Sequence, residues 1–91
     1  MLAERLNLER DVHIAYEEVL AEAEAVKLAH EMEALAKSVL GSVSKRVNAA
    51  AEPEIQRSKA EVAYSTSIIA REQEERQLEV AKQKLVRLWG A

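Results

Sequence analysis

The position of the only proline most constrains how this chain can fold. Pro53 lies just past the middle of 91 residues and separates two long stretches rich in helix-forming residues. The first stretch, about 2–49, contains no proline, and the second, about 54–89, contains neither proline nor glycine. Because proline is tolerated in the first turn of a helix but disrupts its interior, Pro53 marks the start of a second helix. The sequence therefore predicts an all-α fold, a long antiparallel two-helix hairpin that resembles a coiled coil.

A glycine in the first stretch offers a second possible turn. Gly41 costs about 1 kcal/mol relative to alanine in a helix interior, and Ser42 and Ser44 close by weaken the segment further. However, Val39, Val43 and Val47 keep a helical spacing straight through it. We therefore expect one domain over residues 1–91, with a first helix over about 2–49, a turn at about 50–53 and a second helix over about 54–89.

Apolar residues in both stretches follow the spacing of a coiled coil. The stripe predicted for the first helix comprises Val12, Tyr16, Val19, Ala23, Val26, Met32, Leu35, Val39, Val43 and Val47. The stripe predicted for the second helix comprises Ile55, Val62 and Ile69, followed by Leu78, Ala81, Leu85 and Leu88. Between Ile69 and Leu78 of this second stripe, residues 71–77 include no apolar side chain. An antiparallel pairing places this polar block opposite roughly 24–30, where we expect the helices to be separated or lined by water.

Further apolar residues lie outside any single stripe. They are Leu8, Ile14, Leu20, Leu28, Leu40, Ile68 and Val80. One partner helix cannot cover all of them, so we expect the hairpin to pack against further helices and to self-associate. The alternative is that they are scattered surface residues of the kind found on any protein.

Composition argues against several classes of partner. The 13 basic and 16 acidic residues are intermixed and give a net charge of −3. No basic block is present that would follow a phosphate backbone, and three aromatic residues provide no platform for stacked bases. The longest stretch without a charge, Val62–Ala70, is about half of what a membrane-spanning helix needs. We expect no nucleic acid partner and a soluble segment.

No constellation of residues indicates catalysis or a cofactor. His13 and His30 are 17 residues apart on one helix, which separates them by about 25 Å and excludes a shared metal ion. The chain has no cysteine, no glycine-rich phosphate loop and no nucleophile accompanied by a base. A long hairpin also provides no concave pocket. We expect no enzyme activity, no catalytic residue, no cofactor and no metal site.

The end of the second helix resembles a known family. Residues 79–90 close with Leu85-Val-Arg-Leu-Trp-Gly90, which is similar to the closing helix of a hairpin in the outer-membrane factor family. These are the TolC-like channels of tripartite efflux pumps, and the likeness is to the heavy-metal-efflux, CzcC-like branch. The other segments that resemble the family, in order, are Arg10–Leu20, Ala25–Glu31, Lys45–Ala49 and Ser58–Val62. At the tip the chain departs from the family, which often has glycine in place of Ala50 and Ser-Pro in place of Pro53-Glu54.

The resemblance implies a place in a larger assembly. In the family, three protomers join their hairpins into a periplasmic tunnel that continues into an outer-membrane barrel, and the tips meet a periplasmic adaptor protein. The chain would then be a periplasmic hairpin of a longer, membrane-embedded channel protein that exports heavy metals or drugs as a homotrimer. The residues that would contact the adaptor are Arg46, Val47, Asn48, Ala49, Ala50, Ala51, Glu52, Pro53 and Glu54.

Two other interpretations share the same fold. One is the coiled-coil hairpin of the adaptor itself, a membrane-fusion protein, although a Leu-Trp-Gly ending is not characteristic of such hairpins. The other is an antiparallel coiled coil that acts as a spacer or dimerisation module. The residues that flank the hairpin in the parent protein would distinguish them: barrel strands for the channel and a lipoyl-like β-domain for the adaptor.

Overall fold

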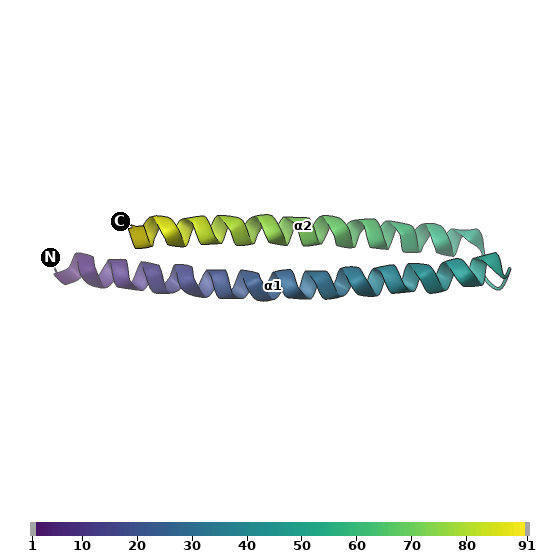
Figure 1. Ribbon diagram of the computed structural model, residues 1–91, viewed down its shortest axis with the longest axis horizontal. Coiled ribbons are helices and arrows are strands. Elements are labelled where there is room, and N and C mark those ends of the chain that lie inside the picture. The colour runs from purple at the N-terminus through teal and green to yellow at the C-terminus, as the bar shows by residue number, and fades with distance from the viewer. Residues whose placement is uncertain (1, 91) are drawn as a thin grey trace.

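Two long helices and one turn make up the described part of the chain. The computed structural model describes residues 2–90, in which α1 spans Leu2–Asn48 and α2 spans Glu54–Gly90. The helices lie antiparallel in a rod of 73 × 14 × 13 Å (Figure 1). The predicted all-α, two-helix hairpin is therefore confirmed. Met1 and Ala91, which the expected single domain includes, lie outside the described residues.

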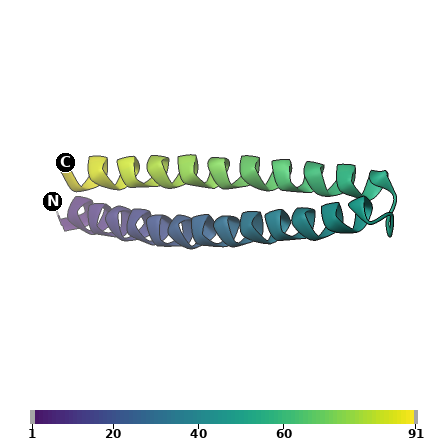
Figure 2. The same ribbon diagram turned by 45° about the vertical axis from the view of Figure 1, so that its right-hand side comes forward.

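The two helices differ in length. α1 has 47 residues and α2 has 37, so the start of α1 projects beyond the end of α2 (Figure 1). A view turned by 45° shows that the helices are connected at one end only (Figure 2). We call that end the tip, and the end where α1 begins and α2 ends the open end. Leu6 lies in the projecting part of α1 and is exposed.

α1 continues through Gly41 without a break, so a turn at this glycine is excluded. An added Cβ at Gly41 would meet no atom within 4 Å, so the residue is not required by close packing. Its neighbours Leu40 and Val43 pack against α2, and Val43 is buried. Tertiary packing of this face therefore outweighs the low helix propensity of glycine.

One stripe of residues on each helix faces the other helix and advances in steps of three and four. We call these two stripes the seam. On α1 it comprises Val12, Ala15, Val19, Glu22, Val26, Ala29, Glu33, Ala36, Leu40, Val43 and Val47. On α2 it comprises Arg57, Ala60, Tyr64, Ser67, Arg71, Glu74, Leu78, Ala81, Leu85 and Leu88. Every seam residue is buried or partly buried, and the 3-4 alternation is that of a coiled coil.

The side chains of the seam are smaller and more polar than those of the predicted stripes. The predicted residues that prove to be exposed are Tyr16, Ala23, Met32, Leu35, Val39, Ile55, Val62 and Ile69. The prediction followed the larger apolar side chains, whereas the regular spacing is completed by Ala15, Ala29 and Ala36 and by two glutamates. Small side chains let the two backbones approach, so fit and register decide which stripe is buried. Leu40, expected outside the stripe, lies within it.

The resulting core is thin. Among the described residues, the buried ones are Ala15, Val43, Ala60 and Ala81, and three of these four are alanine. Most of the large apolar side chains therefore remain on the surface of the rod. Within residues 2–90, neither helix combines the length and apolar character needed to cross a membrane.

Replacing Gly41 with alanine should stabilise the hairpin by about 1 kcal/mol, because alanine loses less conformational freedom in a helix and the site is open. Chemical denaturation followed by circular dichroism measures this change. Ala34→Gly is the matched control, since Ala34 is exposed and lies seven residues earlier on the same side of α1. It should lower stability by a similar amount. A loss of stability in Gly41→Ala would contradict the continuous, open helix at this position.

Candidate functional site

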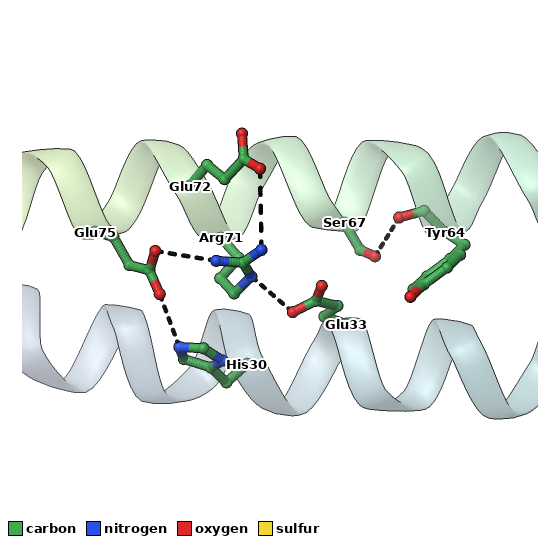
Figure 3. A network of polar contacts seen from close by, with 7 residues as sticks. All are labelled: His30, Glu33, Tyr64, Ser67, Arg71, Glu72 and Glu75. Atoms are coloured by element: carbon green, nitrogen blue, oxygen red, sulfur yellow. Dashed lines mark hydrogen bonds and ion pairs between the residues drawn. The ribbon is translucent and has the colours of Figure 1, made fainter.

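The polar block of α2 joins the two helices. Arg71 extends between them, with its Nε 2.7 Å from Glu33 Oε2 of α1 and its Nη1 3.0 Å from Glu75 Oε2 (Figure 3). Glu75 Oε1 in turn lies 3.0 Å from His30 Nε2. The expectation that the helices are separated here is therefore wrong, because an arginine is long enough to span the seam and is neutralised by carboxylates of both helices. That water lines the block stays a prediction. The block also begins opposite Glu33, somewhat nearer the tip than expected.

Arg71 is well suited to fix the alignment of the helices. Only 21% of its side chain is exposed. Burial of the guanidinium acts to lower its pKa, but the hydrogen bond to Glu75 and the charges of Glu33 and Glu75 outweigh this effect, so the pKa of Arg71 is raised. The side chain therefore stays charged. Sliding α2 along α1 would separate this partly buried charge from Glu33, which disfavours other registers.

At the tip, α1 ends in a specific capping motif. Ala50 has a φ of 58°, in the left-handed region. The N–H of Ala51 donates to the carbonyl of Arg46 at 2.9 Å, and the N–H of Ala50 donates to the carbonyl of Val47 at 3.0 Å. This pair of bonds is the Schellman motif, which satisfies the last carbonyls of a helix. Glycine usually occupies the left-handed position, so Ala50 holds a strained conformation.

Arg57 connects the first turn of α2 to the last turn of α1. Its Nη1 donates to Glu54 Oε1 at 2.9 Å, and its Nη2 donates to the carbonyl of Ser44 at 3.3 Å. The same Nη2 also bonds Asn48 Oδ1. Separately, Arg46 Nε lies 2.8 Å from Glu52 Oε1. The charges of the tip are therefore largely paired within the tip.

The structure places the nine predicted tip residues together at the closed end of the rod. Three of them form the last turn of α1, five form the connection, and Glu54 begins α2. Val47 and Glu52 are partly buried, and the other seven are exposed. The sequence reasoning missed Arg57 and Ser44, which hold the tip together. Arg57 could have been found from its spacing, since it lies three residues before Ala60 in the seam.

A groove beside the seam is lined by small and apolar residues of both helices. Its walls include Leu28 and Met32 of α1 and Ala63, Thr66 and Ala70 of α2. The 3-4 spacing extends the α1 side of this surface in both directions. We call it the apolar flank, and it comprises Ala21, Ala25, Leu28, Met32, Leu35 and Val39 of α1 with Ala63, Thr66 and Ala70 of α2. These residues are exposed, except Ala25, which is partly buried.

The other side of the hairpin is charged. His30 and Lys37 are seven residues apart on α1, and Glu75 and Lys82 are seven residues apart on α2, so each pair lies on one side of its helix. The contact between His30 and Glu75 brings these two sides together. We call this surface the polar flank. Midway along the rod, the hairpin therefore has one flank that favours protein contact and one that favours water, whereas Tyr16, Val86 and Trp89 line an apolar groove at the open end.

The two histidines lie far apart and have separate partners. His13 Nε2 is 3.1 Å from Glu17 Oε1 within α1, whereas His30 contacts Glu75 across the seam. In the part of the chain that the structure describes, no three acidic, histidine or cysteine side chains converge as a metal ion would require.

Comparison with models of protein families, with curated proteins and with solved structures gives no match to this chain.

Replacing Ala50 with glycine should stabilise the hairpin by about 1 kcal/mol, because glycine adopts the left-handed conformation without the penalty of a Cβ. Thermal and chemical unfolding of the purified chain measure the gain. Ala49→Gly is the matched control, since Ala49 has no positive φ, and it should be neutral or destabilising. If Ala50→Gly brought no gain over Ala49→Gly, the tip would have a different helix ending in solution.

Proposed function

We propose that this chain is the periplasmic helical hairpin of an outer-membrane efflux channel, that it forms part of a trimeric tunnel wall, and that its tip contacts the periplasmic adaptor. The observation that carries the proposal is the apolar flank on a hairpin whose own seam is already complete. The similarity of Leu85–Gly90 and of the earlier segments to the heavy-metal-efflux branch of the outer-membrane factors supports the same assignment.

A tunnel wall needs three different surfaces on each hairpin. The seam holds its two helices together, a second apolar surface contacts the next hairpin, and a polar surface meets the water in the channel. The two flanks of this chain provide the second and third surfaces on opposite sides of the rod. The role is passive, because the helices enclose a path and the selection and pumping of the cargo take place in other components.

The tip supports contact by shape rather than by charge. Arg46 is paired with Glu52, and Arg57 is paired with Glu54, so few charges are left for a partner. The outermost residues are small and exposed, namely Ala49, Ala50, Ala51 and Pro53. Such a surface suits close end-to-end docking with another helical hairpin, as the channel–adaptor contact of the family implies.

The adaptor contact can be tested by titrating the ¹⁵N-labelled chain with the isolated α-helical hairpin of a heavy-metal-efflux adaptor. Chemical shifts should change at Arg46–Glu54 and stay constant at the open end. Ala51→Arg should weaken binding by about tenfold or more, since it adds bulk and charge to the small surface of the tip. Ala34→Arg, on the exposed side of α1 far from the tip, should bind normally. Shift changes confined to the region around Trp89 would contradict the proposal.

The contact between neighbouring hairpins can be tested through self-association. The isolated chain should form oligomers in sedimentation experiments, because the apolar flank is uncovered in a single hairpin. The double variant Leu28→Gln, Leu35→Gln should shift the population strongly toward monomer. Leu20→Gln is the control, since Leu20 is 50% exposed but lies outside the apolar flank. A wild-type chain that stays monomeric at high concentration would count against the tunnel-wall role.

A further inference from the structure

The side of α2 that faces away from α1 carries a regular row of side chains. Val62, Ile69 and Arg76 lie seven residues apart, each two residues after a member of the seam. A step of two residues turns about 200° around a helix, so this row points away from α1. All three side chains are exposed, Val62 at 66% and Ile69 at 55%. We call them the outer row, and its two apolar members have no cover in a single hairpin.

The side of α1 that faces away from α2 offers places for such a row. In a coiled coil, each side chain of one helix inserts into a hole formed by four residues of the next helix. Exposed residues of α1 form three such holes in succession toward the tip: the first by Glu24, Lys27, Leu28 and Glu31, the second by Glu31, Ala34, Leu35 and Ser38, and the third by Ser38, Gly41, Ser42 and Lys45. The four residues of the first hole line a shallow groove in the structure, together with two alanines.

The contacts within the hairpin show which parts of the two helices are level along the rod. Arg57 donates to the carbonyl of Ser44, and Arg71 lies against Glu33. The two apolar members of the outer row lie between these arginines in α2, so they are level with the stretch of α1 that forms the second and third holes. Two hairpins that stand side by side with their tips level would therefore bring the outer row of one to the holes of the other.

The charges of the outer row and the holes are complementary. Arg76 is level with the first hole, since the adjacent Glu75 contacts His30 of α1. This hole presents Glu24 and Glu31. Within residues 2–90, neither of these two glutamates nor Arg76 forms an ion pair. A guanidinium of one copy placed between two carboxylates of the next would satisfy all three charges.

The sizes of the remaining side chains match as well. Ile69 is level with the second hole, where Ala34 is small, and Val62 is level with the third, where Gly41 has no side chain and nothing within the hairpin fills the space. Lys27, the one cation of the first hole, is level with two glutamates of α2, one turn on each side of the arginine of the outer row. The match therefore extends over three successive positions of each helix.

We propose that α2 of one hairpin packs against α1 of a second copy with the tips level, so that the outer row of one copy fills the three holes of the next. This inference rests on the proposed contact between neighbouring hairpins, and it adds the surface of the partner and its direction. Leu28 and Leu35 belong both to the holes and to the apolar flank, so the contact continues that flank around α1.

The symmetry of the contact follows from its two different surfaces. Each copy uses α2 toward one neighbour and α1 toward the other, so the contact can repeat around a ring. A two-fold pair through the outer side of α1 is disfavoured, because it would bring Glu24 and Glu31 of both copies together.

Reversal of single charges in the full chain tests the contact. At low salt, Arg76→Glu and Glu31→Arg should each raise the apparent dissociation constant in sedimentation by about fivefold or more, because each brings like charges together. An equal mixture of the two variants should associate more tightly than either alone, since each supplies the charge that the other lacks. Lys82→Glu, which changes the charge equally but on the polar flank, should associate like wild type.

The direction of the partner is tested by oxidative cross-linking, because the chain has no cysteine of its own. A mixture of Ser42→Cys and Val62→Cys chains should form a disulfide between copies, since the outer row brings residue 62 to the third hole. Ser42→Cys mixed with Val86→Cys is the matched control. Val86 is exposed near the open end, so it should form little of the cross-linked product.

The outcomes separate this arrangement from the tunnel wall itself. If wild type associates but the mixed charge variants show no recovery, or if residue 42 cross-links to residue 86 faster than to residue 62, the arrangement is overturned and the tunnel wall stands. A wild-type chain that stays monomeric overturns both.

Discussion

Two helices that pack side by side can cover only one narrow stripe of each other's surface, and every other part of each helix meets solvent or another molecule. In this chain the covered stripe is the seam, which is built largely from alanine, valine and leucine with a few charged residues. Many of the larger apolar residues lie elsewhere. The division between a modest seam and an apolar exterior follows from the register of the two helices, and the proposed role of the hairpin in a larger wall depends on it.

Charged residues in the seam affect the alignment and the stability of the two helices in different ways. Arg71 between Glu33 and Glu75 is matched in charge, so it favours one alignment of the helices. Glu22 has a carboxyl oxygen that is shielded from solvent and has no hydrogen-bond partner, which weakens the seam. At the tip, Arg57 ties α2 to the last turn of α1. The tip half is therefore held by satisfied polar contacts, whereas the open-end half combines leucines and valines with the unsatisfied carboxyl oxygen of Glu22.

Much of the fold could be predicted from the sequence, and the reason is that helix propensity and a lone proline act locally. The position of Pro53 predicted the turn. The helical spacing of Val39, Val43 and Val47 predicted that α1 continues through Gly41, as it does. The seam was harder to predict. The stripe was expected to follow Met32 and Leu35, but pairing between distant residues decides the register, and small or charged residues such as Ala36 and Glu33 complete it.

The site was predictable to a similar degree. The tip residues were found because they surround the turn, whereas Arg57 and Ser44 were missed because their importance comes from contacts across the hairpin. The left-handed conformation of Ala50 also could not be read from residue type, since alanine rarely adopts it. The apolar surface outside the seam was anticipated from the number of apolar residues. Its concentration on one flank became visible only when the register was known.

The register itself is open to direct measurement, because the chain has no cysteine and can carry spin labels at chosen sites. One label replaces Glu75, and the second replaces Ala23, His30 or Lys37, which lie one heptad apart on the same side of α1. The account predicts that the 30/75 pair gives the shortest distance in double electron–electron resonance, since these side chains are in contact across the seam. A shorter distance for 23/75 or 37/75 would mean that the helices have slid by about 10 Å, one heptad. That result would contradict the seam, the apolar flank and the proposals built on them.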